Sequence, residues 1–141
     1  MKKVNEIKID LDFRLKVEKE LKKCNYNDNY VAFWCGVFSN FYPAYFYLDG
    51  KEWSSSEKYF MYMKAITFND NEIAEKIYQS DNPKEIKKLG RLVKNFNNET
   101  WDKVKEGIMY RAVYAKFIQD GLCNRCIKEF QKQILNNHIS I

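Results

Sequence analysis

The chain has 141 residues, of which 45% are apolar and 16% aromatic. This length and composition predict a single domain whose core needs neither disulfides nor a metal for its stability. No apolar run approaches the roughly eighteen residues of a membrane span, and no signal-peptide pattern follows Met1, so we expect a cytoplasmic protein without a membrane partner. The net charge of +5 favours an anionic partner, which is either a phosphorylated small molecule or a nucleic acid.

The cysteines do not predict a metal site. In a cytoplasmic protein they are expected to be reduced thiols. Cys123 and Cys126 have the spacing of half a zinc site, whereas Cys24 and Cys35 lack the short spacing that would complete it. The single histidine, His138, lies near the C-terminus. We therefore expect no bound metal.

Residues 1–29 are expected to form an N-terminal extension. Apolar and polar residues alternate from Ile7 to Val17, which is typical of a strand, but the Lys and Glu content of residues 14–23 suits a helix equally well. Residues 25–29 are predicted to be a turn-rich linker. Residues 30–34 are predicted to be a buried strand at which the core begins.

A hairpin followed by a helix is predicted next. Residues 44–48 are rich in strand formers, the Asp49-Gly50 pair is a strong hairpin signal, and residues 51–53 return on the other side. Ser54 is then predicted to cap a helix that runs to about Ile66, with Glu57 as the reciprocal partner in a capping box. We expect the helix N-terminus to keep this carboxylate ionised.

Further helices are predicted at residues 71–79 and 83–90, the second capped by Asn82. Thr100 is predicted to cap the longest helix, which ends at Gly121. A final amphipathic helix has as its apolar residues Ile127, Phe130, Ile134 and Leu135. Because helices dominate and strands are few, the sequence predicts an α+β fold, a mainly helical single domain with a small antiparallel β element.

Glu57 and Lys64 form a candidate pair of charges. They are seven residues apart in the predicted helix, so they share one face and lie about 10 Å from each other along its axis. This spacing suits a ribose held between a carboxylate and a phosphate-binding ammonium, and it equally suits two solvated surface charges. The residues alone leave both interpretations open.

Several short motifs resemble, in order and spacing, those of one family. They are Ser39-Asn40-Phe41, Asp49-Gly50-Lys51, residues 53–60, Lys88-Leu89-Gly90-Arg91 and the segment from Trp101 to Phe117. Over residues 33–119 the chain is similar to the NADAR (YbiA-like) family. It departs from the family pattern at Lys58 and Met61, where histidine and glutamine are usual. A later family segment with an acid and a tryptophan has no counterpart after Phe117, so we expect a C-terminally shortened NADAR domain over residues 30–141.

The resemblance implies a pocket for a phosphorylated riboside or an ADP-ribose-type ligand, with hydrolysis of its N-glycosidic bond and no cofactor. It implies catalytic roles for Glu57 and Trp101. A carboxylate stabilises the oxocarbenium character of the breaking bond, and an indole offers a flat face to the base. The substrate-binding residues that it implies are Ser39, Asn40, Phe41, Lys64, Gly90 and Arg91.

Two functions remain open at this point. One is an N-glycosidase acting on an ADP-ribose-like or ribosylaminopyrimidine phosphate. The other is a non-catalytic module that binds an ADP-ribose-type nucleotide as a sensor or sponge. ADP-ribosylated nucleic acid is an additional partner compatible with the positive charge.

Overall fold

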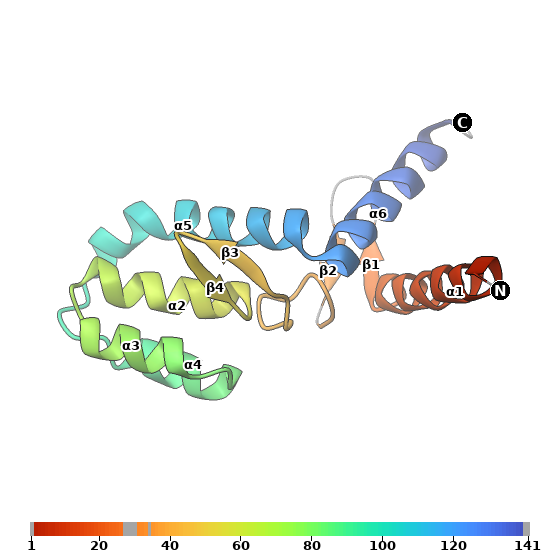
Figure 1. The fold of residues 1–141 in the computed structure, drawn as a ribbon. Helices are drawn as coiled ribbons and strands as arrows, with labels where there is room; N and C mark the ends of the chain where they lie inside the picture. The colour runs from red at the N-terminus through yellow and green to blue at the C-terminus, as the bar shows by residue number, and fades with distance from the viewer. Residues whose placement is uncertain (1, 27–30, 34, 140–141) are drawn as a thin grey trace.

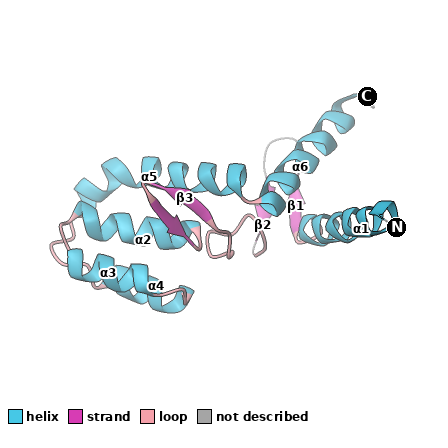
Figure 2. Cartoon of the chain, viewed as in Figure 1, coloured by secondary structure: helices cyan, strands magenta, loops and turns pink. Residues whose placement is uncertain are grey.

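A computed structural model gives the fold and describes residues 2–26, 31–33 and 35–139 (Figure 1). In chain order, the elements are α1 (Lys2–Leu21), β1 (Cys24–Tyr26), β2 (Val31–Phe33), β3 (Phe46–Leu48), β4 (Lys51–Trp53), α2 (Ser56–Thr67), α3 (Asn71–Gln79), α4 (Pro83–Arg91), α5 (Asn98–Gln119) and α6 (Gly121–Ile139). The strands form two short antiparallel pairs, β1–β2 and β3–β4, among the helices (Figure 2). The predicted mainly helical α+β class is confirmed.

Helix α2 lies at the centre of the larger part of the molecule. It runs between α5 on one side and the α3–α4 pair on the other, with the β3–β4 hairpin in front of it (Figure 1). Towards the hairpin, the Trp53 ring meets Tyr59 and Tyr62 edge-on, with ring centroids 5.1 Å and 4.9 Å away. Towards α3 and α4, Ala65 packs in a buried apolar cluster with Ile77. Burial on these sides fixes the rotation of α2 and therefore which residues it turns outward.

The β3–β4 hairpin turns at the predicted Asp49-Gly50 pair, where both residues have a positive φ (53° and 74°). The Asp49 carboxylate accepts hydrogen bonds from the Tyr59 hydroxyl, at 2.6 Å, and from the Arg111 guanidinium. The hairpin is thereby attached to both α2 and α5.

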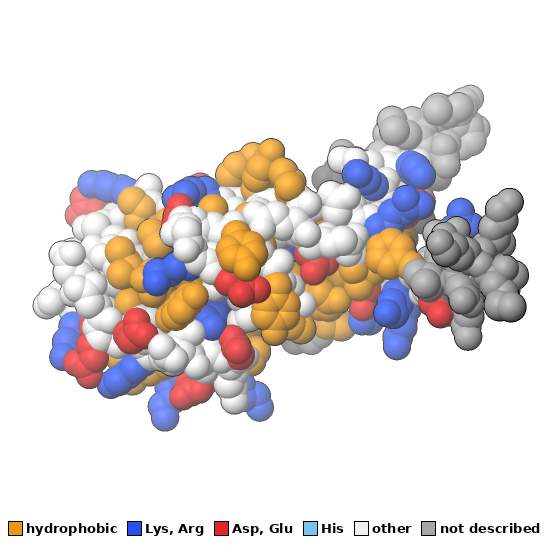
Figure 3. All heavy atoms as spheres, in the orientation of Figure 1, with side chains coloured by type: hydrophobic (Ala, Val, Ile, Leu, Met, Phe, Trp, Pro, Cys, Tyr) orange, Lys and Arg blue, Asp and Glu red, His pale blue; other side chains and the backbone are white. Residues whose placement is uncertain are grey.

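A second attachment joins the hairpin to the end of α5. The Gln119 side-chain amide donates to the Tyr47 carbonyl at 2.8 Å and accepts from the Tyr47 amide at 2.7 Å. The surface over the hairpin and α5 carries many apolar and aromatic side chains (Figure 3). Exposed aromatic residues of these segments are Tyr45, Tyr47, Tyr110 and Tyr114.

Helix α1 packs against α6 at the other end of the molecule (Figure 1). The choice between strand and helix that the sequence left open for residues 7–17 is therefore resolved as helix. Phe13, Val17 and Leu21, four residues apart, enter a cluster with the buried Cys123 and Cys126, whereas Leu11 and Leu15 are each 55% exposed. The domain boundary near residue 29 remains a prediction.

The predictions for residues 25–34 were partly wrong. Asn25 and Tyr26 belong to β1 rather than to a linker, because they pair with Ala32 and Val31 of β2. The predicted second strand is present at Val31–Phe33, but it is not buried, since Phe33 is 48% exposed. Residues 27–30 and 34 lie outside the described residues.

Two helices begin at caps other than the predicted ones. Ser55, not Ser54, caps α2, and its hydroxyl accepts a hydrogen bond from the Lys58 amide. Asn97, not Thr100, caps α5 and accepts from the Thr100 amide. Each cap lies in a run of small polar residues in which more than one can accept such a bond.

The other predicted helices are present, with α3 at 71–79, Asn82 as the cap of α4, and a final helix. Two predicted ends are wrong, because α4 continues through Gly90 to Arg91, and α5 ends at Gln119 while Gly121 begins α6. The side chains of Ile134, Leu135 and His138 lie outside the described residues. No helix of the described chain combines the length and the apolar character that crossing a membrane requires.

Gly90 allows α4 to approach α2 closely. A Cβ atom there would collide with the Sδ atom of Met61 on α2 and lie 3.2 Å from its Cγ atom. We expect Gly90→Ala to lower the free energy of unfolding by about 1–3 kcal/mol in urea titrations, because either the Met61 side chain must leave its present position or the two helices must move apart.

Gly107→Ala is the matched control for this substitution. Gly107 is an exposed glycine of α5, and a Cβ there meets no heavy atom within 4 Å. It is expected to stabilise the protein by about 0.5–1 kcal/mol through helix propensity. Equal effects of the two substitutions would contradict the close contact at Gly90.

Candidate active site

Glu57 lies on the side of α2 that is turned away from the hairpin, two residues before Tyr59 and therefore nearly opposite to it. It is the second residue of the helix, and its backbone amide donates to the Asn40 carbonyl at 3.0 Å. The predicted capping box is therefore wrong, because the helix starts one residue later than expected.

The Glu57 carboxylate is buried but has no protein donor. The residue is 8% exposed, and no hydrogen bond or ion pair joins its carboxylate to another described residue. No fully buried polar side-chain atom of the described chain lacks a hydrogen-bond partner, so the Glu57 oxygens must retain some contact with solvent. The carboxylate thus keeps some contact with solvent and is not part of a sealed polar network.

Burial raises the pKa of Glu57, and the positive charge of Lys87 opposes this rise in part. This direction is opposite to the effect of a helix N-terminus on a carboxylate pKa, and the ionisation expected for Glu57 stays a prediction. The first backbone donors of α2 are already engaged by Asn40 and Ser55, so desolvation outweighs their effect.

The Ser39, Asn40 and Phe41 motif lies in the loop of residues 36–43, which we call the Asn40 loop. The Ser56 hydroxyl, next to Glu57, is within hydrogen-bond distance of both the Asn40 carbonyl (3.3 Å) and its side-chain oxygen (3.2 Å). The Ser39 hydroxyl accepts from the Phe41 amide at 3.2 Å. These contacts hold the loop against the start of α2, so Ser39 and Asn40 have a structural role beside any contact with substrate.

Lys116 of α5 binds the Asn40 loop. The sequence analysis assigned no role to this residue. It is fully buried on α5, and its ammonium donates to the Ser39 carbonyl at 2.8 Å. Burial lowers its pKa. The rings of Tyr42 and Phe117, with centroids 5.6 Å and 5.1 Å away, complete its surroundings.

Lys64 lies two turns after Glu57 and is half-buried, so the interpretation of the pair as solvated surface charges does not hold. Its ammonium donates to the Gly90 carbonyl at 2.8 Å and lies 4.4 Å from the Phe96 ring centroid. Burial lowers its pKa. Lys64 and Gly90 are therefore brought together, whereas the Arg91 side chain is exposed at the end of α4 and makes no hydrogen bond or ion pair with another described residue.

Trp101 lies in the first turn of α5, next to the same side of α2. It is 7% exposed, and its ring centroid is 5.0 Å from that of Phe60, which follows Glu57 by three residues. Phe60 covers part of the indole. A base stacked in this region would therefore meet Phe60 as well as Trp101, and the sequence analysis did not single out Phe60.

No cluster of three His, Cys, Asp or Glu side chains suited to a metal ion occurs within the described ranges. The groups around Glu57 are instead an amide loop, aromatic rings and lysines. This combination suits an organic ligand with an anionic group.

Comparison with known proteins identifies the family. The model of the NADAR domain matches residues 32–139. The chain belongs to the NADAR domain family. The resemblance inferred from the short motifs is thereby confirmed.

Several curated relatives of this NADAR domain are named N-glycosidases. The chain is 37% identical over 105 residues to N-glycosidase R617 of Acanthamoeba polyphaga mimivirus, which covers 70% of the chain and 62% of that protein. It is 37% identical over 84 residues to N-glycosidase YbiA of Escherichia coli K12, covering 60% and 51%. Protein irg-1 of Caenorhabditis elegans is 37% identical over 103 residues, covering 62% and 49%. The matches thus span about half to three fifths of these relatives.

The fold also agrees with a solved NADAR structure. The NMR structure of the E. coli protein YbiA superimposes with a TM-score of 0.60 at 29% identity, over 76% of this chain and 65% of that one. The expected YbiA-like fold is confirmed.

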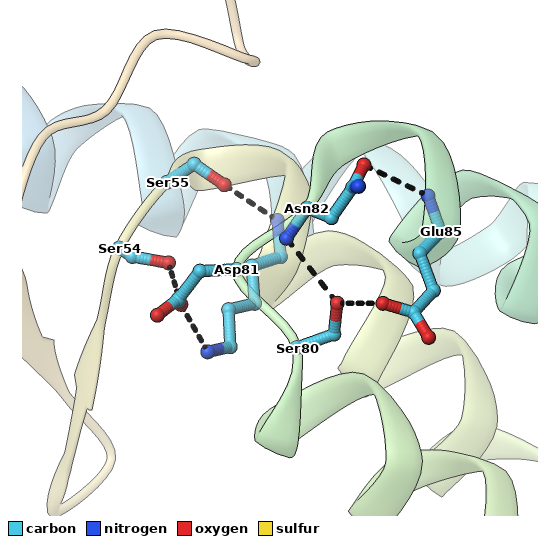
Figure 4. A network of polar contacts seen from close by, with 7 residues as sticks. Ser54, Ser55, Ser80, Asp81, Asn82 and Glu85 are labelled. Carbon is cyan, nitrogen blue, oxygen red and sulfur yellow. Dashed lines mark hydrogen bonds and ion pairs between the residues drawn. The ribbon is translucent and has the colours of Figure 1, made fainter.

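In this NADAR domain, Lys58 joins the start of α2 to the α3–α4 connection. The buried Lys58 ammonium lies 2.9 Å from the Asp81 carboxylate, to which the Ser54 hydroxyl also donates at 2.7 Å (Figure 4). Beside it, Ser80 donates to Glu85 in the first turn of α4. Lys58 stands where family members usually have histidine. Its ion pair with Asp81 holds the segment just before α4 against the start of α2.

Glu57→Gln is expected to raise the free energy of unfolding at pH 7. A carboxylate whose pKa is higher in the folded than in the unfolded state favours folding when protonated, and this advantage is lost as the pH rises through the folded-state pKa. The stabilising effect of the amide should therefore shrink as the pH falls from the raised folded-state pKa towards the ordinary glutamate pKa of about 4.3.

Urea titrations between pH 4 and 7.5 measure this difference. Glu52→Gln, at an exposed position on β4, is the matched control and should show little change with pH relative to the parent protein. A Glu57→Gln variant that is less stable at pH 7 than at pH 4, relative to the parent, would contradict a raised pKa.

Proposed function

We propose that the protein is an N-glycosidase that hydrolyses the N-glycosidic bond of a phosphorylated riboside of the ADP-ribose-like or ribosylaminopyrimidine class. The observation that carries this proposal is the Glu57 carboxylate, which is buried beside the Asn40 loop without a donor among the described residues, with Lys87 close enough to act on its charge. The N-glycosidase names of R617 and YbiA support the reaction class.

The reaction needs a group that stabilises positive charge and a group that transfers a proton. The Glu57 carboxylate can do both. Breaking the bond between C1 and the base nitrogen moves the bonding electrons to the base and leaves positive charge on C1 and the ring oxygen, which an adjacent carboxylate stabilises. Water then forms the new C1–O bond, and its proton passes through Glu57 to the departing nitrogen. A raised pKa makes Glu57 a stronger base for that proton than an exposed glutamate.

The remaining groups bind the two ends of the ligand. Trp101 and Phe60 provide aromatic surface for the base, beside the turn that carries Glu57. Lys64 lies about two turns further along α2, and its positive charge, held at the Gly90 carbonyl, favours the anionic end of the ligand at longer range. Neither a cofactor nor a metal takes part in this scheme.

Glu57→Gln should abolish turnover while ligand binding persists. The amide keeps the shape of the side chain and removes its charge and basicity, so we expect kcat to fall by about 10²- to 10⁴-fold. Release of free base is measured by mass spectrometry after incubation with ADP-ribose, NAD, an ADP-ribosylated guanine nucleoside and a ribosylaminopyrimidine phosphate. Binding of the same ligands is measured by calorimetry.

Glu52→Gln is again the control and should retain full turnover. Unchanged turnover in Glu57→Gln would remove Glu57 from the chemistry. Tight binding by the parent protein, with every ligand recovered intact, would replace the N-glycosidase by a nucleotide-binding module.

A further inference from the structure

The lysines near Glu57 differ in what their ammonium groups contact. Lys58 is ion-paired with Asp81, Lys64 donates to the Gly90 carbonyl, and Lys116 donates to the Ser39 carbonyl. Lys87 has no ion pair or hydrogen bond with any residue that the structure describes. Its three donors are therefore available to a ligand.

Lys87 is nonetheless held beside the site. It lies on α4 one turn before Arg91, and its ammonium is 5.7 Å from the centroid of the Phe41 ring. Phe41 follows Asn40, whose carbonyl binds the Glu57 amide. The positive charge of Lys87 is close enough to Glu57 to act on its pKa. The ammonium thus lies over the Phe41 ring of the Asn40 loop and near Glu57.

We propose that Lys87 and Phe41 form a phosphate subsite, in which the Lys87 ammonium binds the phosphate of the riboside whose glycosidic carbon lies against Glu57. This inference rests on the proposed function. A phosphate placed near a carboxylate is repelled by it, and a nearby cation offsets this repulsion. Lys87 is such a cation, because its charge acts on Glu57 and its ammonium has no ion pair or hydrogen bond with a described residue. The Phe41 ring holds the ammonium over the loop in the free protein and leaves all its donors unused.

The subsite explains why a lysine is placed here without a protein partner. An ammonium already paired with Asp81 or a backbone carbonyl must break that contact before it binds a phosphate. Lys87 exchanges only solvent and a ring contact for a charge-assisted hydrogen bond. The Lys87 side chain is also exposed, so it can change its conformation to meet the phosphate.

The test compares ribose 5-phosphate with ribose in NMR titrations of the full chain, which at 17.0 kDa suits this method. We expect the parent protein to bind ribose 5-phosphate more tightly than ribose. Lys87→Met should weaken ribose 5-phosphate binding by about tenfold, the loss of one charge-assisted contact, and leave ribose binding unchanged. Lys87→Arg should restore most of the loss.

Lys88→Met is the matched control, because Lys88 is the adjacent exposed lysine of the same helix and removing it changes the net charge equally. It should leave both affinities unchanged. Equal weakening by Lys87→Met and Lys88→Met, no weakening by Lys87→Met, or equal binding of ribose and ribose 5-phosphate by the parent would each overturn the subsite.

The test of the phosphate subsite can be distinguished from the test of the N-glycosidase reaction. Phosphate binding that depends on Lys87, without release of base from any substrate, would remove the N-glycosidase and leave the subsite in place. Release of base by a Lys87→Met variant with unchanged affinity for ribose 5-phosphate would remove the subsite alone.

Discussion

The hydrogen bond from the Glu57 amide to the Asn40 carbonyl is the contact on which the candidate site depends. The first backbone donors of a helix have no partner within the helix, so another part of the chain must supply one. Here the Asn40 loop does so, and it covers the first turn of α2, where Glu57 is only 8% exposed. One backbone contact therefore sets both the position of the loop and the burial of the carboxylate.

Polar side chains from distant elements hold this arrangement in place. Lys116 of α5 fixes the loop at Ser39, and Lys58 of α2 fixes the α3–α4 connection at Asp81. Burying an ammonium is costly unless it is hydrogen-bonded, and both lysines meet that condition. These two contacts position α4 and the Asn40 loop against α2 from different directions, and the site requires both.

Local chemistry explains what the sequence predicted well. The Asp49-Gly50 turn and the Asn82 cap are decided by a few adjacent residues, and both are present. The caps of α2 and α5 were misplaced because neighbouring serines or asparagines can serve equally well, and packing decides among them. The motifs indicated the family and singled out Glu57 as a candidate. Lys87, Lys116 and Phe60 make contacts with other elements, and no spacing along the chain reveals such proximity.

The contact between Gln119 and Tyr47 has a consequence for how the molecule meets other proteins. A strand at the edge of a sheet offers its backbone amide and carbonyl to any extended segment that comes near, which is a route to aggregation. The Gln119 amide occupies both groups of Tyr47. The tyrosine-rich surface around the hairpin can therefore meet other molecules through its side chains, while strand addition at Tyr47 would first have to displace Gln119.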